Sequence, residues 1–554
     1  MARDGAQYFV DSLEALGVQY LFGNPGTTEL PIVKSLAGSD IEYILSLHED
    51  VAVGMAAGYA VGSRHTGADD AGLPIGVVNL HVGPGVAHGL CNVYNASRIG
   101  APLLVTAGNH ATTFQSAEPL LAGDLVQMTD QYTKWSAEVE SVDELDTYLK
   151  RGLETALTPP TGPVFLSLPM DVQRAACDLD PLEDLEVGRV ESLDQTAVDE
   201  AADAISSAEE PVLVLGDHLA QGGSESIEAA IAFAEAIGAR VHGEVLAAEV
   251  SFPPDHELWV SPLPPDEDRI RTLLDADTIV LAGVESIVPL TEPTGDLIDS
   301  ETTVITVGFR EPPGLGERPA VAIEGDPGDG LAALAGRLDG VLDPSTLTER
   351  RESISAIKSF VDAMLDELSS PIAPVEDRLS KPAVVEVLHE VAPDAYLVDE
   401  SVTASYPLRA GWDLEPEQYH FAKGSGLGYG VAAAIGVAMT GDGHPVIGYV
   451  GDGSYLYYPQ ALFTAARHDI DLTVLVVDNQ SYSILKANMR SMFDGVSEDE
   501  FIGMDIEPSI DFESLATAQD VASHRANTQS GLKEALTQAI AHDGPALVSA
   551  DVHD

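Results

Sequence analysis

Two glycines flank Asp452 directly after an apolar run, and they begin the stretch that most constrains the fold, residues 451–482. A second apolar run, 472–477, precedes Asn479, which lies 27 positions after Asp452. Residues 459–468, between the two runs, have the pattern of a short helix. Strand, glycine-rich turn, helix and strand form a βαβ unit with a right-handed crossover. The sequence therefore predicts that Asp452 and Asn479 follow the carboxyl ends of parallel strands, where open α/β sheets bind ligands.

The residue types at this edge favour a metal shared with a phosphate group. A carboxylate and an amide oxygen are hard ligands that suit Mg²⁺. Gly451 and Gly453 let the backbone approach phosphate oxygens, and Ser454 adds a hydroxyl at a helix entrance, where free N–H groups favour anions. A Gly-Asp-Gly turn alone is more often an ordinary surface turn. The asparagine at this spacing, after a second buried-type strand, makes the pattern much more specific.

The chain has 554 residues, 45% of them apolar, which is enough for three or four domains with large cores. It carries 90 acidic and 27 basic residues, giving a net charge of −63. Nucleic-acid binding needs a basic surface and is therefore excluded. So large an acidic excess is typical of adaptation to high salt, where mobile ions screen self-repulsion. An ordinary acidic cytosolic protein is the alternative, and loss of stability in dilute buffer would favour the first interpretation.

The two cysteines, Cys91 and Cys177, indicate neither a disulfide framework nor a cysteine-based metal site. Residues 1–18 lack the apolar core of a secretory signal. No apolar run is long and uninterrupted enough to span a bilayer. We therefore expect a soluble cytoplasmic protein.

Short β-branched runs alternate with helical patterns along the chain, which predicts an α/β fold of doubly wound parallel sheets. Three domains are expected, at residues 1–180, 195–340 and 380–554. An acidic linker follows the first, and a charged helical segment from about 345 to 390, broken at residues 369–382, precedes the third. The expected strands are 18–22, 41–47, 75–80, 102–108, 164–169, 211–216, 278–283, 303–308, 395–400, 445–450, 472–477 and 545–552.

The Gly-Asp-Gly pattern with its distant asparagine resembles the diphosphate-binding motif of thiamin diphosphate (ThDP) enzymes. The resemblance extends to the three-domain layout of the benzoylformate decarboxylase and acetolactate synthase large-subunit family, in the order pyrimidine-binding, central and diphosphate-binding. It implies that the Asp452 and Asn479 side chains and the Ser481 carbonyl bind Mg²⁺. The family usually has two successive asparagines, whereas the first position here is Asp478. The ligand position itself is kept, so the departure is mild.

Glu49 ends a predicted strand and precedes a helix of small residues. A glutamate there is more often a helix-start residue stabilised by the helix dipole. The segment 47–60 resembles the family's activating-glutamate segment, which implies that the Glu49 carboxyl is held against the cofactor's pyrimidine ring nitrogen. An apolar setting would raise the pKa of such a carboxyl.

His81 ends the predicted strand 75–80 and precedes a glycine-rich turn, a place from which it can reach a cleft. Imidazole titrates near neutral pH, which suits proton transfer. A lone histidine is usually structural, but the resemblance to the decarboxylases implies catalysis. Residues 22–31 resemble the family's first loop, in which a hydroxyl, here Thr27, could bind a substrate carboxylate. Capping of a helix that begins near Glu29 is an equally good explanation of Thr27.

The glycine-rich loop 422–436 precedes another helix of small residues. By resemblance, Leu427 supports the bent shape of the cofactor, and Ser425 and Gly426 offer backbone contacts to its aminopyrimidine. A glycine-rich helix entrance for tight packing is the compatible alternative. Two further cofactor contacts are implied, by Thr403 and Tyr482.

The resemblance is weaker around the substrate. Benzoylformate decarboxylase has a second histidine in its central domain, whereas residues 283–297 contain none, and Leu290 falls near that position. Ile484 stands where those enzymes carry a small residue. With Leu485, it is expected to line a narrow pocket that favours a small aliphatic 2-oxo acid over an aromatic one. No flavin fingerprint is evident, so FAD is not expected.

Three functions are compatible with these features. The first is non-oxidative decarboxylation of a 2-oxo acid that depends on ThDP and Mg²⁺. The second is carboligation of the acetolactate synthase type, coupling two 2-oxo acids. The third is ThDP binding without turnover, against which Glu49 counts. The family builds each active site from the first domain of one subunit and the third of another, so the resemblance implies a homodimer or homotetramer.

Overall fold

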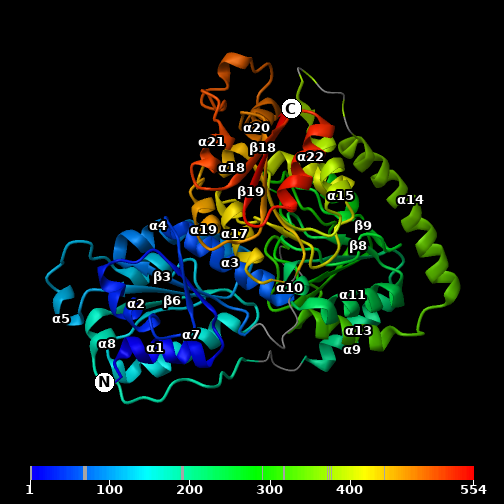
Figure 1. Ribbon diagram of the computed structural model, residues 1–554. Coiled ribbons are helices and arrows are strands. Elements are labelled where there is room, and N and C mark those ends of the chain that lie inside the picture. The colour runs from blue at the N-terminus through cyan, green and yellow to red at the C-terminus, as the bar shows by residue number, and fades with distance from the viewer. Residues whose placement is uncertain are drawn as a thin grey trace. The chain divides into compact units, whose positions relative to one another are not determined.

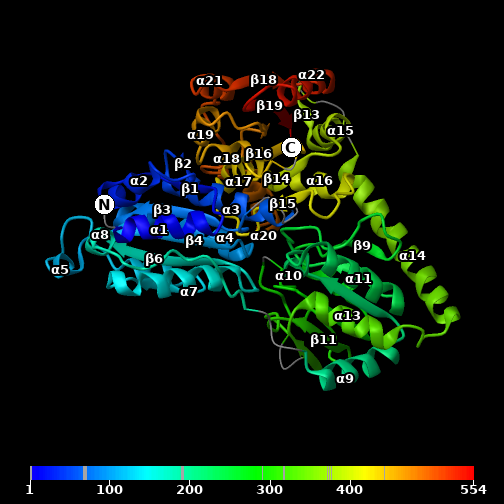
Figure 2. The ribbon, with the colours of Figure 1, turned by 60° about the horizontal axis from the view of Figure 1, so that its bottom comes forward.

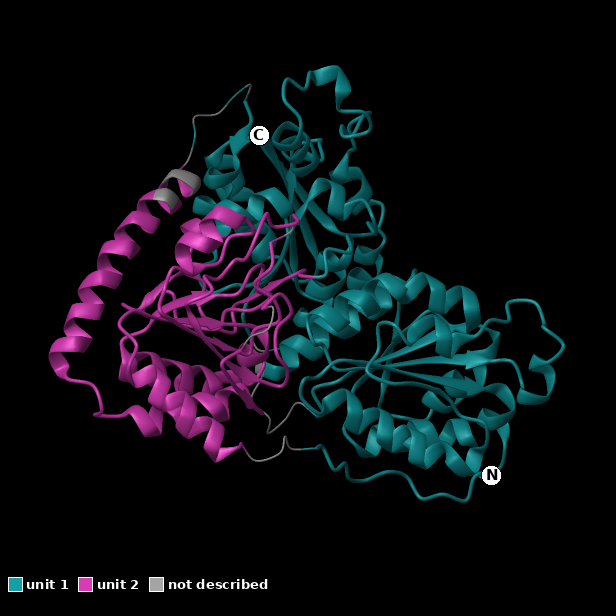
Figure 3. Cartoon of the chain, turned by 180° about the vertical axis from the view of Figure 1, so that it is seen from behind, with its two compact units in different colours: residues 1–188, 371–408, 424–554 teal, residues 189–370, 409–423 magenta. Residues whose placement is uncertain are grey.

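The computed structural model describes residues 3–65, 72–188, 193–289, 291–315, 319–370, 372, 375, 377–441 and 443–553. The strands form three parallel sheets with flanking helices, which confirms the predicted fold class. The chain divides into two compact units (Figure 3). Unit 1 comprises residues 1–188, 371–408 and 424–554, and unit 2 comprises residues 189–370 and 409–423.

The first sheet of unit 1 has parallel strands that are apolar along most of their length, because helices cover both faces. The strand order is β2 (Glu42–Leu45), β1 (Tyr20–Gly23), β3 (Gly76–His81), β4 (Leu103–Asn109), β6 (Pro163–Pro169) and β5 (Ser136–Glu138). Helices α1 (Gly5–Ala15) and α7 (Leu145–Leu157) pack on one face, whereas α3 (Glu49–His65) and α4 (Val82–Arg98) lie on the other (Figure 1). The shorter helices are η1 (Thr27–Glu29), α2 (Leu30–Leu36), α5 (Thr112–Gln115), α6 (Leu125–Thr129), η2 (Val142–Glu144) and α8 (Met170–Arg174).

The other sheet of unit 1 is formed by the C-terminal part of the chain. Its order is β13 (Leu379–Ser380), β19 (Ala546–His553), β17 (Thr473–Asp478), β16 (Val446–Gly451) and β14 (Tyr396–Glu400), with β18 (Ala522–Ala526) also pairing with β19. Helices α17 (Tyr429–Ala438) and α18 (Asp452–Tyr455) lie beside β16 (Figure 2). The remaining helices are α15 (Lys381–Val391), η3 (Val402–Ala404), α16 (Ser405–Gly411), α19 (Ala461–Arg467), α20 (Ser483–Met492), η4 (Glu498–Glu500), α21 (Phe512–Thr517) and α22 (Gln529–Ile540).

Helices α3 and α17 join the two halves of unit 1 and pack closely because both are built from small residues. A Cβ atom at Gly58 would collide with the Ala433 backbone, and one at Gly436 would collide with the Met55 backbone. The helices of small residues noted in the sequence are therefore packing elements at these positions.

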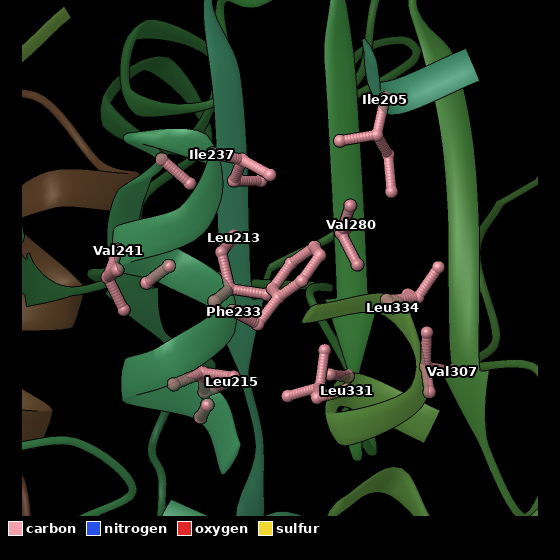
Figure 4. Close-up of a cluster of buried hydrophobic side chains, with 14 of the residues drawn as sticks. Ile205, Leu213, Leu215, Phe233, Ile237, Val241, Val280, Val307, Leu331 and Leu334 are labelled. Carbon is pink, nitrogen blue, oxygen red and sulfur yellow. The ribbon is translucent and has the colours of Figure 1, made fainter. Parts of the chain in front are cut away.

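Unit 2 contains the central sheet, in the order β12 (Val321–Glu324), β11 (Thr303–Gly308), β10 (Thr278–Ala282), β7 (Pro211–Leu215), β8 (Arg240–Gly243) and β9 (Trp259–Pro262). Phe233 of α11 (Gly223–Ile237) and Leu331 of α13 (Pro327–Leu338) are fully buried in the same core as Leu213 of β7 and Val280 of β10 (Figure 4). The other elements are α9 (Gln195–Ser206), α10 (Asp217–Ala220), α12 (Glu267–Leu273), α14 (Pro344–Ser369) and β15 (Tyr419–Phe421).

Every strand expected from the sequence is present, with ends within a few residues of those predicted. Among the strands that the described residues form, seven were missed: β5, β8, β9, β12, β13, β15 and β18. The charged segment from 345 to 390 contains α14, which ends at Ser369, and most of α15, which begins at Lys381, so the predicted break between them is confirmed. In the described part of the chain, no helix combines the length and the apolar character needed to cross a bilayer.

Candidate active site

The first sheet brings Glu49 and His81 together at the carboxyl ends of its strands. Glu49 begins α3 shortly after β2, and His81 is the last residue of β3. A Cβ atom at Gly85 would lie 3.2 Å from Glu49 Oε1 and 3.2 Å from His81 Cβ, so both side chains border this glycine. The Glu49 carboxylate is mostly buried and lies 3.2 Å from His88 Nδ1. A carboxyl group and an imidazole thus share one edge of the sheet.

The loop before α2 surrounds the His81 ring. Glu29, whose side chain is fully buried, places Oε2 2.8 Å from His81 Nδ1. The Thr28 hydroxyl donates to Glu29 Oε1 at 2.5 Å and lies 3.2 Å from the same imidazole nitrogen. A Cβ atom at Gly26 would overlap the ring, so only glycine fits there. These contacts fix the ring orientation and engage Nδ1, which leaves Nε2 as the other proton-transfer atom.

Thr27, the predicted substrate hydroxyl, is exposed and does not contact His81 through a described hydrogen bond. It borders a cavity of about 870 Å³ that is also lined by Arg3, Lys34 and Arg174. The N-cap of η1 is Gly26 and that of α2 is Glu29, so Thr27 does not cap either helix. The capping alternative is therefore wrong for Thr27. Thr28 and Glu29 were missed as site residues, although they directly follow Thr27 in the sequence.

The C-terminal sheet places Asp452 where the βαβ pattern predicted. It follows β16, which pairs in parallel with β17, and its side chain is almost fully buried. Asp452 Oδ1 accepts the N–H of Gly453 at 2.7 Å, and Oδ2 accepts the N–H of Gln480 at 2.6 Å. The segment after β17 is thus tied directly to the Gly-Asp-Gly turn.

Asp452 and Asp478 form a buried pair of carboxyl groups at this edge. Burial, and after it the charge of Asp478, raises the pKa of Asp452 to about 7. Burial and the charge of Asp551 also raise the pKa of Asp478, whose buried Oδ1 has no hydrogen-bond partner. Neither carboxyl is ion-paired within the described chain, since Arg525 pairs with Asp551 instead. Buried carboxyl groups with an unsatisfied oxygen and no cation fit a divalent metal ion.

The neighbouring predicted ligands also supply oxygen. Asn479 Oδ1 accepts the N–H of Ser481 at 3.2 Å, and its amide nitrogen donates to the Ser483 hydroxyl. Ser481 is buried, and its hydroxyl donates to the Met504 carbonyl. No described group of three or more His, Cys, Asp or Glu side chains is arranged to hold a metal. A site here would therefore combine carboxylate, amide and carbonyl oxygens.

The glycine-rich loop before α17 is held by two residues that sequence reasoning missed. The buried carboxylate of Glu400 accepts the N–H groups of Gly428, Tyr429 and Gly430 at 2.9–3.2 Å. Burial raises the pKa of Glu400 to about 8, although these three N–H groups oppose the rise. A helix N-terminus favours such a carboxylate. Its position at the end of the expected strand 395–400 was the available signal.

Asn95 of α4 holds the same loop at Gly426, two residues before Gly428. Its Oδ1 accepts the N–H of Gly426 at 3.0 Å, and its Nδ2 donates to the Gly426 carbonyl at 2.8 Å. Ser425 has a left-handed backbone with φ of 58°, and Leu427 is half-buried. The Thr403 hydroxyl accepts from Lys381 Nζ at 2.9 Å.

The last predicted residues lie around α20. The Tyr482 ring lies against Gly453, where a Cβ atom would be 2.6 Å from a ring carbon, so the turn needs glycine at this point. Gly451 and Ser454 flank the turn, and Ser454 is buried. Ile484 is half-buried on α20, whereas Leu485 is 46% exposed. Leu290, noted in the sequence, lies outside the described residues.

The site residues therefore form two groups. One, with Glu49 and His81, belongs to the first sheet, and the other, with Asp452 and Asn479, belongs to the C-terminal sheet. Three family models match the chain in the same order. The "Thiamine pyrophosphate enzyme, N-terminal TPP binding domain" covers residues 3–133, the central domain covers 198–334, and the C-terminal TPP binding domain covers 406–550. The chain belongs to the thiamine pyrophosphate enzymes.

Relatives of this ThDP enzyme include both reaction types expected from the sequence. Benzoylformate decarboxylase of Pseudomonas aeruginosa is 29% identical over 96% of each chain. A protein of Mycobacterium tuberculosis described as an acetolactate synthase large subunit is 27% identical over 98% of each chain. By these names, the relatives include both a decarboxylase and an acetolactate synthase subunit.

Solved structures give the same fold over the full length. A thiamin diphosphate-dependent enzyme from Mycobacterium smegmatis superimposes with a TM-score of 0.84 at 26% identity, covering 100% of both chains. A thiamine diphosphate-dependent 4-hydroxybenzoylformate decarboxylase from Rhodococcus jostii RHA1 gives 0.83 at 25% identity, covering 100% of this chain and 99% of the other.

Proposed function

We propose that this ThDP enzyme catalyses the Mg²⁺-dependent, non-oxidative decarboxylation of a small aliphatic 2-oxo acid. The observation that carries the proposal is the shared edge of Glu49 and His81, with the ring of His81 held by the buried Glu29. The whole-length similarity to a benzoylformate decarboxylase supports it.

The C-terminal sheet would hold the diphosphate end of the cofactor. Asp452, Asn479 and the Ser481 carbonyl would bind Mg²⁺, because they supply hard oxygens at a buried edge without a cation. Ser454 and the N–H groups of the Gly-Asp-Gly turn would face the phosphate oxygens. When bound, ThDP would supply the electron sink for decarboxylation.

Residues at the edge of the first sheet would hold and transfer protons. Glu49 would hold a proton against the pyrimidine nitrogen from its mostly buried position at the start of α3. His81 would transfer a proton through Nε2, because Glu29 engages Nδ1. Thr27, at the rim of a cavity that also contains Lys34 and Arg174, would meet the substrate carboxylate. We place the two groups of residues in one active site through a homodimer or homotetramer, so the active enzyme should not be a monomer.

Glu49→Gln tests the proton-holding role. The amide keeps the size of the side chain but cannot carry the acidic proton, so kcat should fall by roughly a hundredfold to ten-thousandfold. Loss of 2-oxo acid and release of carbon dioxide would be measured with ThDP and Mg²⁺ at high salt. Glu42→Gln, an exposed change on β2, is the matched control. Turnover by Glu49→Gln at the wild-type rate would refute the mechanism.

Product analysis separates decarboxylation from carboligation. Pyruvate should give acetaldehyde, whereas an acetolactate synthase-like enzyme would give acetolactate. Ile484 tests the substrate class, because Ile484→Ala should raise kcat/KM for benzoylformate relative to pyruvate. A wild-type enzyme that prefers benzoylformate over pyruvate and short branched 2-oxo acids would overturn the aliphatic assignment.

A further inference from the structure

The central sheet in unit 2 carries a buried acidic group after each of three adjacent strands. Asp217 follows β7, Glu244 follows β8, and Glu285 follows β10, and all three strands run parallel. Their side chains are 2%, 0% and 7% exposed, respectively. Three carboxylates so deeply buried need compensation, because an isolated buried charge is very unfavourable.

Lys423 supplies that compensation from a distant part of the sequence. Its ammonium lies 2.5 Å from Asp217 Oδ2, 2.7 Å from Glu244 Oε1 and 3.1 Å from Glu285 Oε2. The lysine side chain is only 7% exposed. Burial alone would lower the pKa of Lys423, but the surrounding carboxylates raise it, so the ammonium stays charged.

Backbone groups complete the cluster. Asp217 Oδ1 accepts the N–H groups of Ala248 and Glu249 at 2.8 and 3.2 Å. Glu244 Oε2 accepts those of Glu285 and Ser286 at 2.7 and 3.1 Å. These backbone hydrogen bonds hold the carboxylates in place. Arg310 also pairs with Glu285 at 3.4 Å, and Lys423 is the cation that contacts all three carboxylates.

This cluster lies where open α/β sheets normally bind their ligands. The strand order reverses between β7 and β10, and ligands of such sheets bind outside the carboxyl ends at that reversal. A Cβ atom at Gly216 would collide with the Gly283 carbonyl, so glycine is needed to bring the two strand ends together. The crevice is thus occupied by a side chain of the protein itself, and its carboxylates would repel a phosphate.

Lys423 is also the last residue of unit 2 before the chain enters the glycine-rich loop. The preceding strand is anchored too, because the N–H of Phe421 donates to the Ala248 carbonyl at 2.8 Å. Three residues later, Gly426 is clamped by Asn95 within unit 1. The loop 424–428 therefore begins at one fixed point and passes through another.

We propose that Lys423 is a positioning residue, whose ionic anchor in the central sheet fixes the start of the loop 424–428. This inference rests on the proposed function, in which that loop contacts the cofactor through Ser425, Gly426 and Leu427. The central domain would then serve the active site by holding one end of the cofactor loop rather than by binding a nucleotide.

Lys423→Met tests the anchor, because methionine fills similar space without charge. Lys358→Met is the matched control, since Lys358 also lies in unit 2 but, among the described residues, donates to the His256 carbonyl alone, at 3.2 Å. Hydrogen exchange of the cofactor-free protein should show faster exchange across residues 419–428 in Lys423→Met alone. The dissociation constant of ThDP with Mg²⁺, measured by calorimetry, should rise by roughly tenfold or more.

Chemical rescue keeps the test valid if the methionine variant does not fold. Lys423→Ala removes the atoms beyond Cβ, and propylamine replaces them as a separate cation. Propylamine should restore exchange protection and ThDP affinity in this variant, whereas propanol, which has no charge, should not. Equal rescue by both compounds would show that the space matters rather than the charge, and it would overturn the anchor.

The outcomes separate this inference from the proposed function. Unchanged loop exchange and unchanged ThDP affinity in Lys423→Met would refute the positioning role while leaving the function intact. Faster loop exchange with unchanged ThDP affinity would also refute it, because the anchor would then not reach the cofactor. If the wild-type protein binds ThDP but turns over no 2-oxo acid, the proposed function fails, whereas the positioning claim is still decided by exchange and affinity.

Discussion

Two sheet edges in this enzyme present buried carboxylates, and they are balanced in opposite ways. At the central sheet, Asp217 and its neighbours surround the Lys423 ammonium. At the C-terminal sheet, Asp452 and Asp478 face each other without an ion-pair partner in the described chain. Both sets follow parallel strands, so topology alone does not separate them.

The contrast appears in the pKa values of the aspartates at the two edges, which shift in opposite directions. Lys423 overcomes the effect of burial and holds the pKa of Asp217 below its ordinary value. Burial and Asp478 raise the pKa of Asp452 to about 7. One edge thus contains its cation and is complete, whereas the other is suited to a cation from solution. The same local topology yields the proposed anchor in one domain and the proposed metal-binding edge in the other.

Removing one charge should lower the stability of the protein at the central edge but not at the C-terminal edge. Lys423→Met leaves buried carboxylates uncompensated and should lower the free energy of unfolding by about 3–5 kcal/mol. Asp452→Asn removes one of two repelling carboxylates and should leave the metal-free protein equally or more stable. Urea titrations in metal-free buffer at fixed high salt measure both, with Lys358→Met as control. A destabilisation by Asp452→Asn as large as that by Lys423→Met would contradict the contrast.

Adding Mg²⁺, the cation proposed for the C-terminal edge, should make the contrast between the two edges clearer. Mg²⁺ with ThDP should stabilise the wild-type protein by about 2.7 kcal/mol at a hundredfold excess over the dissociation constant, because ligands that bind only the folded state shift unfolding by mass action. Asp452→Asn should lose most of this gain. Thermal unfolding with and without a chelator measures the effect. Equal stabilisation of both proteins would show that the metal binds elsewhere.

The pH dependence of the central edge should give the smallest effect. Burial, and then the charge of Asp217, raises the pKa of Glu244 from 4.5 to about 7. The folded protein keeps this proton where the unfolded chain loses it, so its contribution to stability is full at low pH and disappears as the pH rises through 7. Between about pH 6 and 7, wild type should therefore lose at most about 1.4 kcal/mol relative to Glu244→Gln, with little further loss above about pH 8. Parallel stability curves for the two proteins would refute the raised pKa.

Sequence reasoning recovered the fold where the strands are long and apolar. The strands it missed are short or carry polar residues, such as Ser136–Glu138 and Ala522–Ala526, so they lack the apolar run on which prediction depends. The βαβ pattern also placed Asp452 correctly, because the motif is local and its crossover has one hand.

The contacts that sequence reasoning missed depend on residues far apart in the chain. Lys423 lies 206 positions from Asp217, and Asn95 lies 331 positions from Gly426. Neither pair has a signal in one sequence, because each exists only after the sheets have formed. The choice between Thr27 and Thr28 depended instead on the backbone of one turn, which directs the second hydroxyl toward His81.

The late position of Lys423 has a consequence for synthesis on the ribosome. Asp217, Glu244 and Glu285 are translated well before the lysine that joins them. Until residue 423 leaves the exit tunnel, closing the central sheet would bury Asp217 and Glu244 without their counter-charge, whereas Glu285 already has Arg310 at 3.4 Å. The nascent domain should therefore stay partly open until then, and its final closure should coincide with the emergence of the cofactor loop.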